Sequence, residues 1–139
     1  MNEFVTGREC EVLSDTGNTP VSAAFAVVEG AKGFMLLYNK YRRLWELAGG
    51  MLEPGETPRD CAARECMEES GQRLCSLEFM GLVKYASMNA AIYYAYLDNE
   101  APFVENDEIQ ALRWFKTGAD TAGMCGESVR FIRMRRPNF

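Results

Sequence analysis

A dense acidic cluster constrains this chain more than any other feature. Glu65, Glu68 and Glu69 follow one another at spacings i, i+3 and i+4, so in a helix the three carboxylates lie on one face. Like charges placed this way repel one another by roughly 0.2–0.5 kcal/mol per exposed pair. A helix that keeps three of them together therefore predicts a cation among them.

A solvent-exposed helix face is the alternative. Arg64 precedes Glu68 by four residues, so the two would form an ordinary ion pair on an exposed helix. The three glutamates alone favour this alternative, because a run of charges is usually solvated. The spacing of the surrounding residues decides between the two.

The composition is that of a globular protein, and it narrows the chemistry. The 139 residues are 47% hydrophobic and 25% charged, which suits a single domain over residues 1–139. The chain has no histidine, which excludes a Ser-His-Asp triad and His-ligated zinc. The net charge of −5 argues against DNA as a partner. A polyanionic substrate would need a cation or a local basic patch.

Cysteine usage and hydropathy favour a cytoplasmic location. The five cysteines form no CxxC pair, and we expect reduced or buried thiols. Cys10 and Cys75 lie near strand-like runs. The first residues have no apolar signal core, and no run approaches the roughly 18 apolar residues that span a membrane. We expect no membrane partner, and both a monomer and a homodimer stay open.

Strand-like runs dominate the chain, and two helices interrupt them. The apolar patterns predict strands at 21–29, 34–39, 44–47, 76–85, 91–97 and 111–115. Turns and loops are expected at 30–33, 40–43, 48–50 and 99–107. Together with a closing helix near 125–134, this order predicts an α/β fold with helices packed on a mixed sheet.

The acidic cluster lies in the first helix. Thr57 suits the N-cap, Pro58 the first helical position and Asp60 the third. Gly71 suits the position just after the helix. Carboxylate oxygens are hard ligands, so the cluster favours Mg²⁺, Mn²⁺ or Ca²⁺ over zinc. The glycine loop before the helix lets backbone approach the carboxylates, which suggests metal-assisted chemistry on a phosphate compound.

The segment from Gly50 to Gln72 resembles the Nudix box of the MutT-like Nudix hydrolase family. The box has fixed glycine and charged positions, and the chain matches them with Gly50, Glu56, Arg64, Glu65, Glu68, Glu69 and Gly71. Cys66 and Gln72 stand where the family usually has aliphatic residues, and Ala48 stands where a proline is common. Cys66 still suits a buried side. Gln72 is expected to alter only local packing.

The resemblance implies a Nudix-type α/β/α sandwich around a mixed β-sheet. It implies Mg²⁺- or Mn²⁺-dependent hydrolysis of a nucleoside diphosphate linked to another moiety. The metal would be held by Glu65, Glu68, Glu69 and a carbonyl of Gly49 or Gly50. Glu56 and Arg64 would orient these carboxylates. The base that activates water varies across the family, and the candidates are Glu65, Glu68, Glu108 and Glu105, with Glu108 preferred on the late loop.

The substrate must be recognised by residues outside the box. Tyr41 and Trp45 would stack on a base or pack in the core, and Arg42 and Arg43 would contact phosphates or form a solubilising turn. By family analogy we expect a small nucleotide such as the modified triphosphate 8-oxo-dGTP. ADP-ribose, other nucleotide sugars, dinucleoside polyphosphates and capped RNA remain alternatives. A Nudix-like module that senses a nucleotide without cleaving it is the alternative from another class.

Overall fold

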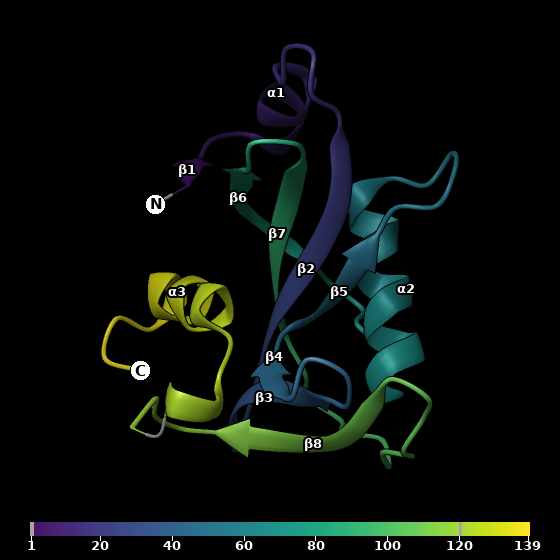
Figure 1. Ribbon diagram of the computed structural model, residues 1–139, viewed down its shortest axis with the longest axis vertical. Helices are drawn as coiled ribbons and strands as arrows, with labels where there is room; N and C mark the ends of the chain where they lie inside the picture. Colours follow the sequence, from purple (N-terminus) through teal and green to yellow (C-terminus); the bar gives the residue numbers. More distant parts are fainter. Residues whose placement is uncertain (1, 120) are drawn as a thin grey trace.

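The computed structural model describes residues 2–119 and 121–139 and has a mixed α/β architecture (Figure 1). The predicted mixed sheet with packed helices is confirmed, and the sheet has eight strands. The elements are β1 (Glu3–Val5), α1 (Glu9–Ser14), β2 (Val21–Gly30), β3 (Gly33–Asn39), β4 (Leu44–Glu46), β5 (Ala48–Met51), α2 (Pro58–Ser70), β6 (Glu78–Lys84), β7 (Asn89–Tyr96), β8 (Ile109–Phe115), the 3-10 turn η1 (Thr121–Gly123) and α3 (Gly126–Arg135). Within the described residues, no helix has both the length and the apolar character needed to cross a bilayer.

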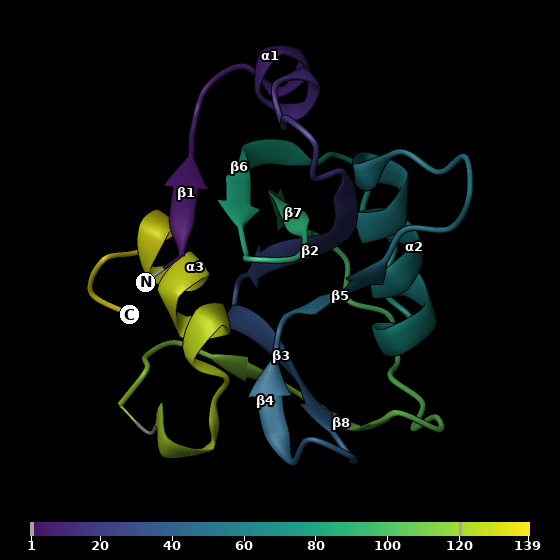
Figure 2. The same ribbon diagram turned by 45° about the horizontal axis from the view of Figure 1, so that its top comes forward.

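The strand β2 is buried on both faces and separates two helical layers. It pairs in parallel with β7 and antiparallel with β5. Ala23 and Val27 join the core cluster that contains residues of α3, whereas Ala24 joins the cluster that contains residues of α2. Because side chains alternate along a strand, this pattern places α2 and α3 on opposite sides of the sheet, as Figures 1 and 2 show.

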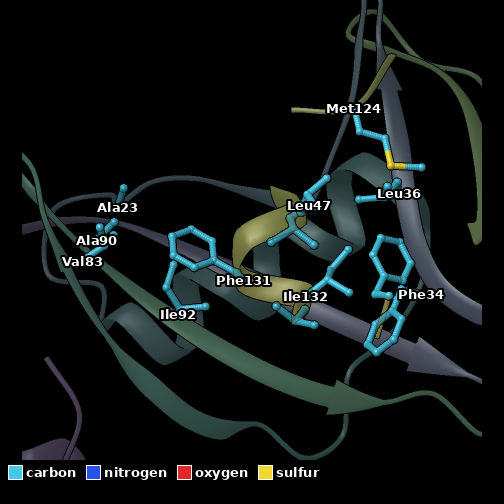
Figure 3. Packing of buried hydrophobic residues seen from close by; sticks show 13 residues of the cluster. Ala23, Phe34, Leu36, Leu47, Val83, Ala90, Ile92, Met124, Phe131 and Ile132 are labelled. Atoms are coloured by element: carbon cyan, nitrogen blue, oxygen red, sulfur yellow. The ribbon is translucent and has the colours of Figure 1, made fainter. Parts of the chain in front are cut away.

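The helix α3 covers one face of the sheet with a compact apolar core. Phe131 and Ile132 are buried against strand residues that include Ile92 and Leu36 (Figure 3). The ring of Phe34 meets that of Phe139 edge to face at 5.5 Å. The chain end after α3 therefore closes this side of the core.

The caps of α2 agree with the sequence prediction. The Thr57 hydroxyl accepts a hydrogen bond from the Asp60 backbone N–H at 3.1 Å. Gly71 has φ = 76° and ends the helix, with its N–H donating to Met67 O at 2.9 Å. The N-cap Thr57 and the terminating Gly71 each depend on a few neighbouring residues. Both could therefore be predicted from the sequence without knowledge of the fold.

Two local assignments were wrong. Residues 48–50 were expected to be a loop but belong to β5, which pairs with β2. Cys10 lies in α1 rather than near a strand. Glycine and alanine have low strand propensity, so only the distant partner β2 makes β5 a strand. The short β1 and α1 were not predicted, and the Arg8 side chain makes no capping hydrogen bond to α1.

Gln72 does more than alter local packing. Its side chain is fully buried, and the amide donates to Ala101 O at 2.8 Å and to Ser70 O at 3.1 Å. Its carbonyl accepts from Ala101 N at 2.7 Å. The polar residue at this aliphatic position of the box therefore attaches the loop before β8 to the end of α2.

We predict that Gln72→Leu lowers the free energy of unfolding by about 1–3 kcal/mol, because it leaves the partly buried Ala101 backbone groups without partners. Urea unfolding measures the change. Gln110→Leu, on an exposed position of β8, is the matched control and should change stability by less than about 0.5 kcal/mol. Equal losses in the two variants would contradict the role of the buried amide.

Candidate functional site

The two glycines of β5 allow close approaches on two sides, Gly50 toward α2 and Gly49 toward β2. A Cβ on Gly50 would lie 2.7 Å from Cδ of Glu65, and one on Gly49 would lie 2.5 Å from the carbonyl oxygen of Ala24. Real Cβ atoms do not tolerate such distances, so any larger residue would displace the Glu65 carboxylate or the strand. Glycine at these positions therefore sets how near backbone and carboxylates come.

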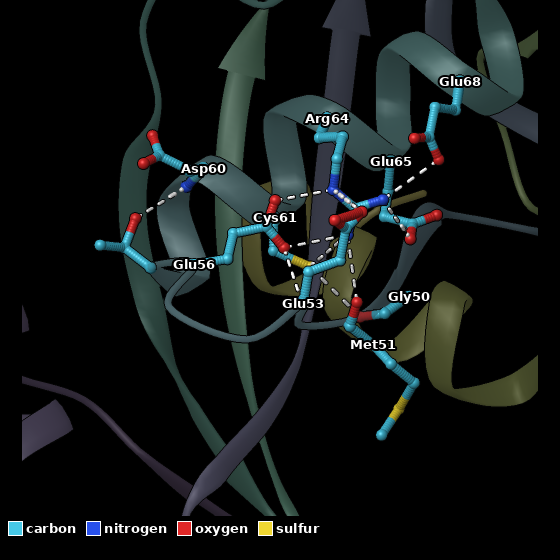
Figure 4. Close-up of polar contacts among 10 residues, drawn as sticks. Gly50, Met51, Glu53, Glu56, Asp60, Cys61, Arg64, Glu65 and Glu68 are labelled. Atoms are coloured by element: carbon cyan, nitrogen blue, oxygen red, sulfur yellow. Dashed lines mark hydrogen bonds and ion pairs between the residues drawn. The ribbon is translucent and has the colours of Figure 1, made fainter.

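Arg64 is the hub of the carboxylate cluster (Figure 4). Its guanidinium donates to Glu56 at 2.7 and 2.9 Å, to Glu65 at 2.9 Å and to Glu68 at 3.1 Å. It also donates to the carbonyl of Met51 in β5 at 3.1 Å. A planar guanidinium has five donors in a fixed fork, so one side chain fixes three carboxylates relative to β5.

The hub holds Glu56 in its ionised form. The hydrogen bonds from Arg64 lower the pKa of Glu56 to about 2, and the backbone N–H of Glu53 acts in the same direction. The same contacts raise the pKa of Arg64. Glu56 therefore keeps its charge at neutral pH and serves as a permanent partner of Arg64.

Glu69 has the opposite environment. Its side chain is only 8% exposed. It accepts a hydrogen bond from the Gly49 N–H at 2.9 Å. Burial raises the pKa of Glu69 to about 8, and the nearby charges of Glu108, Glu65 and Glu46 add to the effect. Burial also raises the pKa of Glu65. Within the described residues, no arginine or lysine lies within ion-pair distance of Glu69.

A cavity of about 610 Å³ lies beside these carboxylates. Its walls are largely apolar and include Phe25, Leu47 and Phe131, which belong to or pack against the core cluster of α3. The acidic and basic residues that line it are Arg42, Glu46, Glu65, Glu69, Glu108 and Glu127. The volume lies in the range of small-ligand sites, and such sites combine apolar walls with a few polar groups.

Comparison with known sequences assigns the family. The sequence profile of the NUDIX domain matches residues 19–119, a span that holds the Arg64 hub, β5 and Glu108. The chain belongs to the Nudix family. The stretch from Gly50 to Gln72 is its Nudix box, and the prediction made from that stretch is confirmed.

Individual relatives are distant. A Bacillus subtilis protein named "Putative 8-oxo-dGTP diphosphatase" is 24% identical over 98 residues, which are 68% of this chain and 66% of that protein. A Pseudomonas syringae NAD-capped RNA hydrolase is 36% identical over 76 residues, 52% of this chain and 27% of that protein. The chain thus spans less than two thirds of each.

A solved structure supports the fold. The MutT NUDIX hydrolase of Burkholderia pseudomallei superposes with a TM-score of 0.71 and 21% identity, covering 84% of this chain and 98% of that one. At this identity the likeness concerns the fold. The expected Nudix-type arrangement of helices around a mixed sheet is confirmed.

The residues predicted for catalysis lie in two groups. Glu56, Glu65 and Glu68 meet at Arg64, and Glu68 is the most exposed of them. Glu108 precedes β8 and lines the cavity with Glu65 and Glu69. The other base candidate, Glu105, pairs with Lys40 at 2.9 Å and is not among the cavity-lining residues. Their catalytic roles stay predictions.

Of the residues predicted to contact substrate beside the glycine loop, one lines the cavity and three do not. Arg42 lines the cavity, whereas Tyr41 is 76% exposed and, like Arg43 and Trp45, is not among the lining residues. The Trp45 ring packs edge to face at 5.3 Å against both Tyr38 and Phe115. This geometry favours the packing alternative for Trp45 and leaves Arg42 as the candidate for phosphate contact.

Several lining residues were missed by sequence reasoning. Tyr85 donates to Glu127 at 2.9 Å, and the Ser128 hydroxyl accepts from Leu47 N at 3.0 Å. These residues come from β6–β7 and α3, far from the Nudix box in sequence. Their types are ordinary on exposed surfaces, so no local signal distinguished them.

The donor set fits a divalent cation. Glu65 and Glu69 offer hard oxygens at the cavity, and the excess of carboxylates around Glu69 is the environment that a divalent ion relieves. Among the described residues, no three candidate ligands already converge on one point. Arg64 holds Glu65 and Glu68, and Gly49 N–H holds Glu69.

We predict that Mg²⁺ or Mn²⁺ raises the melting temperature more at about pH 9 than at about pH 6, because protons and cations compete for ligand carboxylates. Without metal, the pKa of Glu69 rises from 4.5 to about 8 on folding. The folded state then binds the extra proton, so stability falls as the pH rises through this window. Differential scanning fluorimetry measures both effects.

Glu69→Gln is the test variant. It should flatten the pH dependence without metal and reduce the cation-dependent shift, because the amide neither titrates nor binds metal as a carboxylate does. Glu3→Gln, at an exposed position of β1, should keep both. A cation effect of equal size at the two pH values would contradict the assignment.

Proposed function

We propose that this Nudix protein hydrolyses a nucleoside diphosphate linked to another moiety, with Mg²⁺ or Mn²⁺ as its cofactor. The observation that carries the proposal is the contact between the carboxylate cluster and the cavity, because Glu65 and Glu69 belong to both. A pyrophosphate held at the carboxylates would place its nucleoside between apolar walls. The intact set of box carboxylates favours an enzyme over a module that only senses nucleotides.

Each box residue has a proposed role. Glu65, Glu68, Glu69 and a carbonyl of Gly49 or Gly50 would hold the cation. When bound, a divalent ion neutralises pyrophosphate charge and makes water a stronger nucleophile. Glu56 and Arg64 keep the ligand carboxylates oriented. Arg42, at the cavity wall, is suited to bind a phosphate oxygen.

Glu108 is the proposed base that accepts a proton from the attacking water. It lines the cavity beside Glu69 and is not engaged by Arg64. The other late-loop candidate, Glu105, pairs with Lys40 and is not among the cavity-lining residues. A general base must lie within hydrogen-bond reach of the proton it removes, which favours Glu108.

For the substrate we propose a modified guanine nucleoside triphosphate such as 8-oxo-dGTP. Glu127 lines the cavity and is held by the Tyr85 hydroxyl at 2.9 Å. The Watson–Crick edge of guanine presents two adjacent N–H donors, which a carboxylate accepts together, whereas adenine presents a donor beside an acceptor. The name of the Bacillus subtilis relative agrees with this choice. Capped RNA is the second candidate, which the Pseudomonas relative favours.

We predict that Glu68→Gln lowers turnover by several orders of magnitude, because it removes a charge that the cation requires. Products from a panel of nucleoside triphosphates, ADP-ribose, dinucleoside polyphosphates and capped RNA are identified by mass spectrometry. Glu11→Gln on the exposed side of α1 is the control and should keep wild-type turnover. Activity near the wild-type level in Glu68→Gln would overturn the role of Glu68. No cleavage of any panel member would favour the sensor.

We predict that Glu127→Gln reduces the preference for guanine over adenine nucleotides roughly 10- to 100-fold in kcat/KM, the discrimination of one bidentate base contact. The amide presents a donor as well as an acceptor, so it no longer repels adenine. Glu78→Gln, whose carboxylate pairs with Arg135 outside the cavity, should keep the preference. An unchanged ratio in Glu127→Gln would exclude base recognition by this residue.

A further inference from the structure

Asn39 is a buried polar residue next to the site, and none of the roles above uses it. It ends β3, and its side chain is only 1% exposed. It lies opposite Ile109 of β8, where the pairing of β3 with β8 shifts register between Tyr38 and Asn39. Such irregularities turn a side chain away from the ordinary alternation and are common beside active sites.

The Asn39 amide joins two segments. Its Nδ2 donates to Glu108 Oε1 at 3.0 Å. Its Oδ1 accepts from the backbone N–H of Tyr41 at 2.9 Å and from that of Arg42 at 3.0 Å. The amide thus holds the Glu108 side chain with its donor and the turn that carries Arg42 with its acceptor.

Backbone contacts make this connection rigid. Lys40 N–H donates to Glu108 O at 2.9 Å, and Arg43 N–H donates to Asn39 O at 2.8 Å. Arg43 has φ = 56°, a left-handed conformation that costs a residue with a side chain roughly 1–3 kcal/mol. Such a conformation persists only where the surrounding contacts determine it.

The connection ends at the cavity. Arg42 and Glu108 line it, whereas Asn39 is not among the lining residues. The Arg42 guanidinium donates three hydrogen bonds of 2.8–3.1 Å to Glu46 and lies 3.6 Å from Glu108. Arg42 and Glu108 are therefore the cavity-lining residues to which the Asn39 side chain is hydrogen-bonded.

We propose that Asn39 is a positioning residue, which aims the Glu108 carboxylate at the reacting phosphoanhydride and fixes it relative to Arg42. The inference rests on the proposed function and adds to it. The amide N–H holds Glu108, the residue proposed to remove a proton from water. The amide oxygen holds the backbone of Arg42, the residue proposed to bind phosphate.

Asn39→Asp separates these two effects. The aspartate keeps an acceptor for the backbone N–H groups but places an oxygen where the donor was, so it repels the Glu108 carboxylate. We expect kcat to fall about 10²-fold, the usual result of misplacing a catalytic group by about 1 Å, with little change in KM. Asn39→Ser places no charge there and reaches neither partner well, so kcat should fall and KM should rise.

A double-mutant cycle with Glu108→Gln shows whether the effect passes through Glu108. In the Glu108→Gln background, we expect Asn39→Asp to change the remaining kcat by less than about twofold, because no base is left to misplace. Asn89→Asp is the matched control. Asn89 is another buried asparagine, and its Nδ2 donates to Thr19 O at 2.8 Å away from the cavity. It should change the melting temperature without coupling to Glu108.

The outcomes are distinct. Equal losses of kcat in both backgrounds would overturn the positioning role and leave the proposed function intact. A wild-type protein that cleaves no panel nucleotide overturns the proposed function and the positioning role with it. If Asn39→Asp does not fold cooperatively in a thermal melt, the same cycle with Asn39→Ser decides, because its kcat loss must also require Glu108.

Discussion

The site contains more carboxylates than cations, and its two arginines, Arg42 and Arg64, pair with only some of them. Arg64 holds Glu56, Glu65 and Glu68, and Arg42 holds Glu46 and lies near Glu108. Glu69 accepts a hydrogen bond from the backbone N–H of Gly49 and, within the described residues, lies in no ion pair with an arginine or lysine. A buried carboxylate without a cation is costly, and it takes up a proton or requires a cation.

The backbone produces this imbalance through the strands β5 and β2. Gly50 allows β5 to lie against α2, and the N–H of the neighbouring Gly49 reaches Glu69. The central strand β2 then sets α2 and α3 on opposite faces of the sheet. The cavity is consequently lined by carboxylates from α2 and by the apolar and polar groups of α3, which is the combination that a nucleotide with its phosphates requires.

The sequence contained the local parts of this arrangement but not the distant ones. The caps Thr57 and Gly71 and the spacing of the box glutamates are set within one helix, so they could be predicted. The strand β5 could not, because its Ala-Gly-Gly residues form a strand only when β2 pairs with them. Glu127 lies more than fifty residues after the box, and only the packing of α3 brings it to the same cavity.

Trp45 and Gln72 show the limits of reading residue types alone. A tryptophan beside a basic turn is compatible with base stacking, but the pairing of β4 with β3 turns Trp45 toward Tyr38 and Phe115. A glutamine at an aliphatic position suggests a minor packing change. Its partner is the backbone of Ala101, which no pattern near the box identifies.

The two polar hubs differ in charge, and the difference suits their roles. Arg64 is a cation and keeps Glu56 ionised at all physiological pH values, as an orienting partner should be. Asn39 is neutral, so it fixes the direction of Glu108 without neutralising it. Arg42 already lies 3.6 Å from that carboxylate, and an arginine at position 39 would add a second guanidinium that competes with any proton Glu108 must accept. A neutral amide next to the proposed base, and a guanidinium beneath the proposed ligands, is therefore the assignment of charges that hydrolysis at this site requires.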